Sequence, residues 1–363
     1  MVKLAPVHFS QVPGFEIANL LPAFKAFQQT ARAFASQVPE LRPALPVQAD
    51  LRAAFRASLA IENASEDVAR QFFQSRFVPH NVHPEAGSGF LTGYYEPEVQ
   101  GSLTQSDMFS CPILSRPDDL ITFDQNAPPP LAGYAAARRL QNGALVPYFS
   151  RAEIEAGAAR QHTQPVVFLE DAVEVFLIQV QGSARVTLPD GRKLRLKYAG
   201  RNGHPYTSIG KIIIAQNHIA PESMTLALLK SWLRGNDLRI GGLARSIMQR
   251  NNSYVFFEIQ HDDEQSGGPI GGAGQPLTPL LSLAIDRTLW SYGLPFWIDA
   301  QLPFKRNASE SFQRMMIAQD TGSAIIGPAR GDVFFGTGDE AGVLAGNIRH
   351  TAGFTVFLPK PDA

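Results

Sequence analysis

Cysteine is almost absent from this chain, because Cys111 is the single one among 363 residues. One thiol excludes an internal disulfide and a metal centre built from several thiolates. The count is compatible with the cytosol and also with an oxidising compartment, since neither requires a second cysteine. We interpret Cys111 as a small apolar residue.

Long apolar runs, an excess charge and internal repeats are missing as well. No stretch of about eighteen apolar residues could span a bilayer, and residues 1–6 lack the apolar core of a signal peptide. We therefore expect either a cytosolic protein or one whose export signal has been removed. The 32 basic and 33 acidic residues nearly balance, which argues against nucleic acid and anionic membranes as partners. The absence of a repeat of fixed period argues against a solenoid or propeller.

Turn-forming residues and phenylalanine are abundant. The chain has 30 Gly, 27 Pro and 24 Phe but only 18% charged residues, which favours a mainly β protein with peripheral helices over a helical bundle. Its length predicts two domains. We expect this α+β chain to form one domain from residues 1–105 and 251–363, and a second, inserted domain from residues 106–250.

The apolar spacing predicts the elements along the chain. Helices are expected within residues 16–76, with Ser65 as an N-cap, and a strand over 89–99 that leaves its sheet at Pro97. Ser150 and Glu153 form a capping box. The remaining expectations are a hairpin of 173–188 with 193–198, helices over 224–233 and 243–248, and strands over 253–259, 267–274, 277–284, 296–300 and 354–358 in a compact barrel.

Three aspartates within twenty residues are the main chemical signal. Asp320, Asp332 and Asp339 are flanked by glycines and separated by short apolar runs. This pattern places the carboxylates at strand ends and tight turns, where a catalytic acid can be held. An aspartate can also simply shape a turn by bonding its own backbone.

Other kinds of site find less support. Asp320-Thr321-Gly322 matches the tripeptide of aspartic proteases, but a second copy for the carboxylate pair is absent from the sequence. His80 and His83 lack an obvious third metal ligand, and the acidic run 262–264 is typical of a solvated loop tip. Gly182-Ser183 lacks a nucleophile elbow. We expect no metal and no cofactor.

Six blocks in one order resemble the family of bacterial membrane-bound lytic murein transglycosylase A. The resemblance covers about residues 89–358, and the family's catalytic aspartate aligns with Asp332. The spacing between the first two aspartates varies in the family, so this alignment depends on the Val-Phe-Phe-Gly-Thr-Gly that follows. The blocks are 90–97 (FLTGYYEP), 150–154 (SRAEI), 179–183 (QVQGS), 198–206 (YAGRNGHPY), 208–211 (SIGK) and 320–342.

The resemblance implies a fold, a site and a reaction. It implies a double-psi β-barrel built from both ends of the chain, a second barrel-like domain inserted between them, and a glycan groove. Asp332 would be the sole acid/base, with Asp320 and Asp339 supporting it, and Tyr94 or Tyr95 could stack on a sugar. Sugar contacts would come from Thr92, Tyr94, Glu96, Gln179, Gln181, Gly182, Ser183, Tyr198 and Asn202.

The implied reaction is lytic cleavage of the bond between MurNAc and GlcNAc in peptidoglycan. One carboxyl donates a proton to the leaving oxygen and then accepts the proton of the sugar's own C6 hydroxyl, which closes a 1,6-anhydro ring. The family implies a monomer at the periplasmic face of the outer membrane, its anchor trimmed here, with glycan strands and other cell-wall enzymes as partners. A wall-binding protein without activity and an aspartic-type peptidase are the alternatives.

Overall fold

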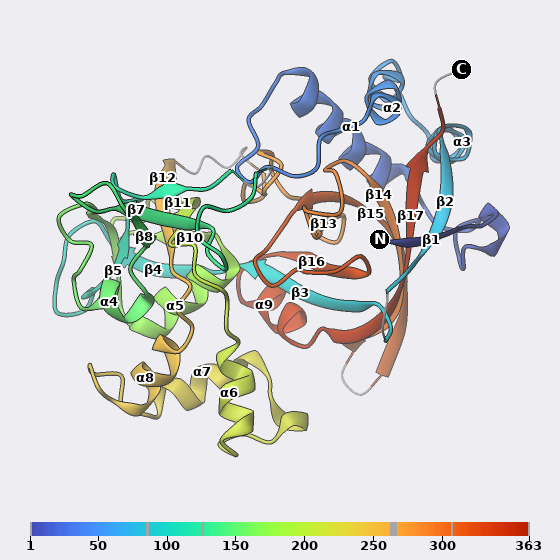
Figure 1. The fold of residues 1–363 in the computed structure, drawn as a ribbon. Coiled ribbons are helices and arrows are strands. Elements are labelled where there is room, and N and C mark those ends of the chain that lie inside the picture. The colour runs from blue at the N-terminus through green and yellow to red at the C-terminus, as the bar shows by residue number, and fades with distance from the viewer. Residues whose placement is uncertain (1, 85–86, 125–126, 262–266, 306–307, 362–363) are drawn as a thin grey trace. The chain divides into compact units, whose positions relative to one another are not determined.

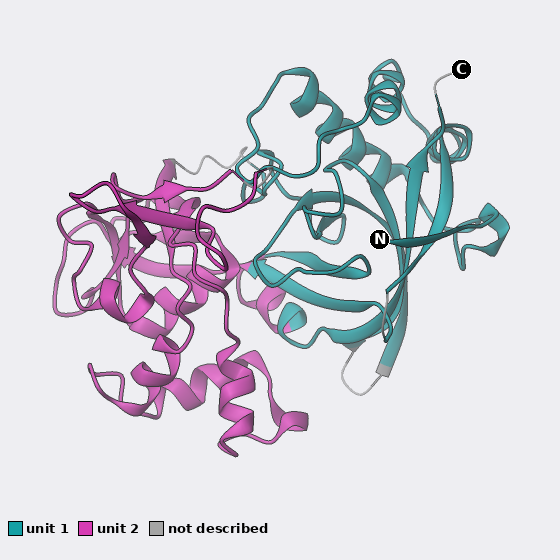
Figure 2. Ribbon diagram, viewed as in Figure 1, with its two compact units in different colours: residues 1–95, 267–336, 344–363 teal, residues 96–266, 337–343 magenta. Residues whose placement is uncertain are grey.

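Two compact units make up the chain (Figure 2). The computed structural model describes residues 2–84, 87–124, 127–261, 267–305 and 308–361. The first unit contains residues 1–95, 267–336 and 344–363, and the second contains residues 96–266 and 337–343. The domain limits expected near residues 105 and 250 both lie within the second unit.

Three helices open the first unit, as the apolar spacing predicts. They are α1 (Leu21–Ala35), α2 (Ala49–Leu59) and α3 (Glu66–Arg76). The predicted cap of α3 is confirmed, because the Ser65 side chain accepts a hydrogen bond from the Val68 amide. A cluster of phenylalanine rings from all three helices excludes water from their shared interface: Phe24, Phe27, Phe55, Phe72 and Phe73.

An eight-stranded sheet forms the body of the first unit (Figure 1). Its order is β1-β2-β17-β14-β15-β13-β16-β3, and β17 also pairs with β3. This extra pairing closes six strands into a ring: β17, β14, β15, β13, β16 and β3. The bounds are β1 Lys3–Pro6, β2 Phe77–His83, β3 Phe90–Glu96, β13 Ser282–Ala284, β14 Pro295–Lys305, β15 Ala308–Asp320, β16 Arg330–Thr337 and β17 Arg349–Pro359, with η1 (Phe9–Gln11) and α9 (Asp339–Gly346) beside them.

Several sequence predictions for this sheet are wrong. Residues 267–274 contain no strand, only one side of the isolated bridge between Ile270 and Pro276. In the stretch predicted from 277 to 284, only β13 is extended. The longest strand, β15, was not predicted, because its residues 315–318 are buried on both faces and show no alternation of apolar and polar residues.

The second unit combines two sheets with helices. One sheet has the order β12-β11-β10-β4-β9-β5, and its edge strands β12 and β5 also contact each other; the other is β6-β7-β8. The strand bounds are β4 Glu98–Ser102, β5 Cys111–Leu114, β6 Ile121–Thr122, β7 Ala136–Arg139, β8 Leu145–Pro147, β9 Pro165–Leu169, β10 Ala184–Thr187, β11 Lys193–Arg201 and β12 Val255–His261. The helices are α4 Arg151–Glu155, α5 Ala172–Gln181, α6 Ile209–Ala215, η2 Pro221–Ser223, α7 Leu226–Arg234 and α8 Leu243–Gln249.

Most of the first arm of the predicted hairpin is a helix instead. Only β10 and β11 form the hairpin, and residues 172–181 form α5. Asp171 caps this helix by accepting hydrogen bonds from two backbone amides, and Gly182 ends it in a left-handed conformation at φ 89°. Val175 and Ile178 pack against the strands while Phe176 and Leu177 pack against the other helices. Since apolar residues cover both faces, the helical period is hidden.

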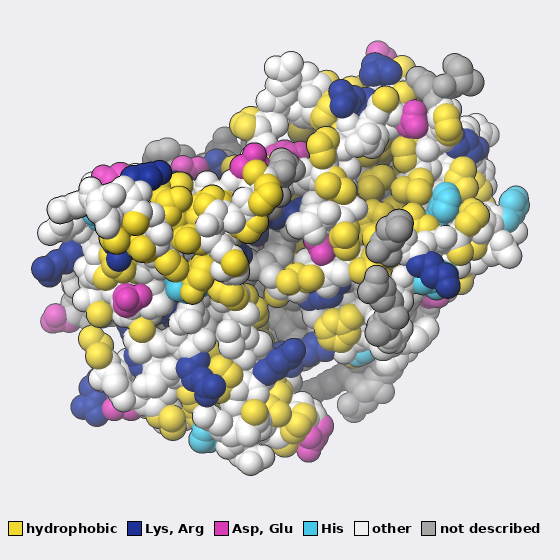
Figure 3. Space-filling model, in the orientation of Figure 1, with side chains coloured by type: hydrophobic (Ala, Val, Ile, Leu, Met, Phe, Trp, Pro, Cys, Tyr) yellow, Lys and Arg dark blue, Asp and Glu magenta, His cyan; other side chains and the backbone are white. Residues whose placement is uncertain are grey.

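The surface carries both signs of charge. On the face drawn in Figure 3, basic and acidic side chains are interspersed, as the balanced composition implies. Among the described residues, no helix has the length and apolar character needed to cross a membrane.

Candidate active site

Two neighbouring strands of the first unit bring Thr92 and Asp332 together. Thr92 lies on β3 and Asp332 on β16, 240 positions apart in the sequence. The Thr92 hydroxyl donates a hydrogen bond of 2.5 Å to Oδ1 of Asp332. The Thr92 hydroxyl, predicted to bind sugar, is therefore used to hold the predicted catalytic carboxyl.

The Asp332 carboxyl has the electrostatics of a proton donor. Its pKa is raised to about 6, chiefly by burial. The charge of Arg330 and the hydrogen bond from Thr92 oppose this rise, while the charge of Asp320 adds to it. A group with such a pKa can hold its proton in mildly acidic solution and release it close to neutrality.

Arg330 is a member of this cluster that the sequence did not reveal. Its Nη2 donates to Thr92 Oγ1 over 2.8 Å, and its Nη1 donates to the Gly331 carbonyl. The threonine oxygen thus accepts from Arg330 while its hydrogen points to Asp332. The available signal was the two-residue period of β16, which places Arg330 on the same face as Asp332.

Asp320 ends β15 and is surrounded by donors. Its Oδ2 accepts from the Tyr94 hydroxyl at 2.7 Å, and its Oδ1 accepts from the amides of Gly272 (2.7 Å) and Thr321 (2.8 Å). These bonds fix the carboxylate and, through its charge, the field at Asp332. A supporting role for Asp320 in catalysis stays a prediction.

Gly272 can approach Asp320 only because it has no side chain. A Cβ at this position would lie 2.4 Å from the Tyr292 hydroxyl oxygen and 3.2 Å from Cγ2 of Thr321. The Tyr292 hydroxyl in turn donates to the Arg42 carbonyl at 2.9 Å. Sequence reasoning assigned Gly272 to a strand and missed this contact.

Tyr94 is part of the protein's own hydrogen-bond network. Its ring lies 5.4 Å from that of Phe334, and its hydroxyl bonds Asp320. Burial, followed by the charge of Asp320, raises the pKa of Tyr94 well above its ordinary value, so it remains a donor. Tyr95 is only 4% exposed and belongs to the core. Neither environment is the exposed one that stacking on a sugar, expected for one of the two rings, would require.

Asp339 does not share a turn with the other two aspartates. It is exposed and lies in the first turn of α9, where a negative charge favours the helix N-terminus. The predicted turn at this position is thus a helix start. A supporting role in catalysis stays a prediction for Asp339.

Two predicted sugar ligands are buried within the second unit. Glu96 is 0% exposed and pairs with Arg195, with 2.8 Å between Oε1 and Nε, while its Oε2 accepts from the Thr337 hydroxyl at 2.7 Å. Asn202 is also 0% exposed, and its amide bonds backbone groups of Phe149, Asn252, Tyr254 and His204. These environments are structural, because the polar atoms of both residues are already occupied.

The glutamine block lies at the end of α5. Gln179 is 5% exposed, with Gln181 and Gly182 partly exposed and Ser183 9% exposed at the start of the next segment. Tyr198 is partly buried on β11, at a bulge in its pairing with β12. Sugar binding by these residues stays a prediction.

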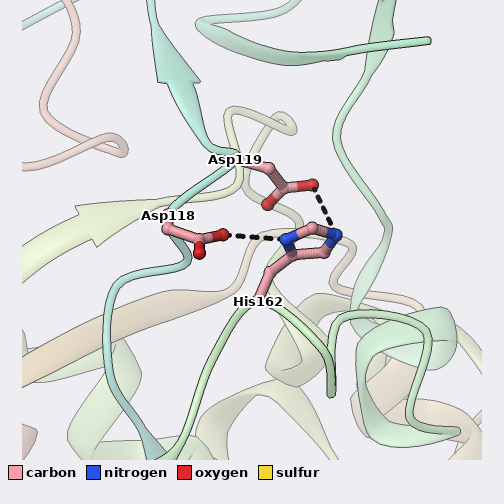
Figure 4. Close-up of side chains that lie close together, drawn as sticks. All are labelled: Asp118, Asp119 and His162. Carbon is pink, nitrogen blue, oxygen red and sulfur yellow. Dashed lines mark hydrogen bonds and ion pairs between the residues drawn. The ribbon is translucent and has the colours of Figure 1, made fainter. Parts of the chain in front are cut away.

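One group of side chains has the composition of a metal site (Figure 4). Among the described residues, three side chains that could bind a metal lie close together: Asp118, Asp119 and His162. Each ring nitrogen of His162 faces a different carboxylate, Nδ1 at 2.8 Å from Asp118 and Nε2 at 3.6 Å from Asp119. One ion can be bound by only one of these nitrogens, so the arrangement fits a histidine clamped between two acids. The acidic run 262–264 lies outside the described residues.

Comparisons with known proteins identify the family of this chain. Residues 90–258 match the MltA specific insert domain and residues 281–358 match the 3D domain. Membrane-bound lytic murein transglycosylase A of Vibrio cholerae is 30% identical over 271 residues, which are 73% of this chain and 64% of that protein. The chain therefore spans just under two thirds of this relative.

Solved structures match nearly the whole chain. A membrane-bound lytic murein transglycosylase from Agrobacterium tumefaciens has a TM-score of 0.86 and 32% identity, with 98% of each chain covered. The E. coli MltA structure with bound chitohexaose has a TM-score of 0.62 and 25% identity, covering 99% of this chain and 92% of that one. This chain belongs to the family of membrane-bound lytic murein transglycosylase A.

Proposed function

We propose that this protein is a lytic transglycosylase that cleaves the β-1,4 bond from MurNAc to GlcNAc in peptidoglycan, with Asp332 as its sole acid/base. The observation that carries the proposal is the environment of Asp332. The carboxyl is held by Thr92 on one oxygen, and its pKa is raised to about 6, chiefly by burial. The E. coli relative solved with chitohexaose supports a β-1,4 aminosugar chain as the ligand.

The hydrogen-bond directions assign the proton to one oxygen of Asp332. Because Thr92 accepts from Arg330, its single hydroxyl hydrogen is committed to Oδ1 of Asp332. Oδ1 is thereby an acceptor, and Oδ2 carries the proton of the neutral acid. This proton passes to the oxygen of the leaving GlcNAc as the bond from C1 of MurNAc breaks.

The second half of the reaction restores the acid. The C6 hydroxyl of MurNAc forms the new bond to C1, and its proton returns to the Asp332 carboxylate. No water is consumed, so the reaction needs no second carboxylate to activate one. Asp320 supports this assignment, since both its oxygens are occupied by Tyr94, Gly272 and Thr321. The same bonds disfavour an aspartic-protease pair that shares one proton.

We further propose the finer assignments of fold and partners. The closed ring of six strands supports a double-psi β-barrel for the first unit, and the contact of β12 with β5 supports a barrel-like second unit. Glycan strands would be bound with the help of Gln179, Gln181, Ser183 and Tyr198. The relatives are named membrane-bound transglycosylases, which supports a site of action at the periplasmic face of the outer membrane.

Digestion of purified sacculi tests the proposed reaction. The native protein is expected to release muropeptides that end in 1,6-anhydro-MurNAc, and Asp332→Asn should lower the rate at least about 1,000-fold because no other group supplies the proton. Asp299→Asn is the matched control, since Asp299 lies on β14 and bonds Gln313 instead. Reducing-end products would show hydrolysis, and binding without soluble product would show a wall-binding protein; either would contradict the proposal.

A further inference from the structure

A cavity of about 480 Å³ opens beside the Arg330 side chain in the first unit. Its wall is mostly apolar, and Arg330 is the charged side chain among its lining residues. Phe90 is 41% exposed and Ile326 75% exposed, so apolar surface remains accessible there. Phe90, Ile326 and Arg330 are among the side chains that line the cavity.

Arg330 connects this cavity to the acid. Its guanidinium carbon lies 5.5 Å from the centre of the Phe90 ring, a cation–π contact that positions the group beside one wall. The hydrogen bonds to Thr92 and Gly331 use two of the five N–H groups that a guanidinium carries. A ligand anion in the cavity would thus meet a positioned cation that is one side chain away from Asp332.

The chemistry of the cavity selects its ligand. A guanidinium at an apolar wall favours a carboxylate on a short, partly apolar arm, because the charge-assisted bond strengthens where water is excluded. In a MurNAc–GlcNAc strand, only MurNAc carries such an arm, the lactyl ether on C3. Its carboxylate is free in strands without stem peptides, and in intact strands the arm continues into a peptide that bears a glutamate carboxylate. Chitin-type chains lack the arm.

We propose that this cavity binds the carboxylate-bearing arm on C3 of MurNAc, and that Arg330 is the residue that recognises it. The inference depends on the proposed function, since it names the part of the substrate that distinguishes peptidoglycan from chitin. The sugar whose arm is anchored is also the sugar whose C1 bond is cut. Binding of the arm therefore places a MurNAc, and not a GlcNAc, next to Asp332.

Binding to the full chain that carries Asp332→Asn tests the proposal without turnover. Three ligands of equal length are compared by calorimetry: chitohexaose, glycan strands stripped of stem peptides, and strands that keep them. At least one MurNAc ligand is expected to bind about tenfold more tightly than chitohexaose, as one charged hydrogen bond implies. A preference for stripped strands identifies the lactyl carboxylate, and a preference for intact strands identifies the peptide carboxylate. Equal affinity for all three overturns the proposal.

Two further substitutions in the Asp332→Asn protein test whether the preference for MurNAc strands arises at this cavity. Ile326→Trp fills the cavity from its exposed side, and Arg330→Gln removes the cation; both are expected to abolish the discrimination between MurNAc strands and chitohexaose. Ile240→Trp is the matched control, because Ile240 is a comparably exposed isoleucine of the second unit at 81%. A preference that survives Ile326→Trp overturns the proposal. If native protein releases no anhydro products but the preference holds, the proposed reaction fails while the cavity assignment stands.

Discussion

At the scale of single residues, Thr92 sets the working pH of the acid. Its hydrogen bond stabilises the carboxylate form of Asp332 and so lowers a pKa that burial has raised. Thr92→Val removes this donor while keeping the shape of the side chain. The pKa of Asp332 is then expected to rise by about one unit above its value of about 6.

The pH dependence of muropeptide release measures this shift. The rate falls on the alkaline side as Asp332 loses its proton, so a higher pKa moves this limb towards higher pH. Thr355→Val is the control, since Thr355 donates to Asn81 in the same unit. An alkaline limb that stays in place in Thr92→Val, or that moves equally in both variants, would refute the role of Thr92.

The sequence identifies the acids of this site but not their partners. Asp320 and Asp332 stand out because they lie among glycines and apolar runs near each other in the chain. Their partners Thr92, Tyr94 and Gly272 are distant in sequence, at separations of 240, 226 and 48 positions in the corresponding bonds. Only the tertiary fold of the first unit, which has no local signal in the sequence, brings such residues into contact.

At the scale of elements, the turn that contains Gly272 anchors the end of β15. Gly272→Ala would place its Cβ 2.4 Å from the Tyr292 hydroxyl oxygen, so the turn or the Tyr292 side chain must move, and we expect the bond from residue 272 to Asp320 to weaken. We expect a loss of about 1–3 kcal/mol in the free energy of unfolding. Activity should fall more than tenfold, because Asp320 loses one of the donors that fix it near Asp332.

Urea unfolding and sacculus digestion together test this expectation. Gly210→Ala in α6 is the control, because its Cβ would have only ordinary contacts, 3.8 Å from Ser208 and 4.0 Å from Met224. Alanine in a helix is favoured over glycine, so this change should be neutral or slightly stabilising. Equal stability of the two variants would show that the turn tolerates a side chain at position 272.

Elements with local signals were predicted, and elements decided by tertiary packing were not. The cap at Ser65 and the capping box at Ser150 are interactions within four residues, and both form as predicted. In α5, β-branched residues favour a strand, but Asp171 and Gly182 cap a helix that is buried on both faces. Here burial, which the sequence shows only as continuous hydrophobicity, overrides propensity.

At the scale of the whole molecule, the chain passes from one unit to the other just before a proline. β3 ends at Glu96 and β4 begins at Glu98, so Pro97 alone separates the strands, and the units divide between residues 95 and 96. The proline-rich stretch 112–130, used to place the limit near 105, lies inside the second unit. Composition marks irregular loops, and these occur within a domain as well as between domains.

The chain enters the second unit after Tyr95 and again after Gly336. Glu96 links these two crossing points to the interior of the second unit. Its side chain pairs with the buried Arg195 of β11 and accepts from Thr337, and its backbone carbonyl accepts from the Gly338 amide at 2.9 Å. Burial raises the pKa of Glu96, and the charge of Arg195 opposes that rise. The attraction between the two charges therefore offsets part of the free-energy cost of burying each of them.

Glu96→Gln should accordingly cost about 3–5 kcal/mol in the free energy of unfolding at pH 7, because it removes the carboxylate that lies 2.8 Å from the buried Arg195 guanidinium. Glu98→Gln is the matched control: its pair with Lys193 is partly exposed on both sides, at 36% and 49%, and should contribute at most about 1 kcal/mol. The double change Glu96→Gln with Arg195→Met removes both charges and should recover part of the loss. Urea unfolding of the three variants measures these free energies. If Glu96→Gln is no less stable than Glu98→Gln, the buried pair is not needed to stabilise the crossing points.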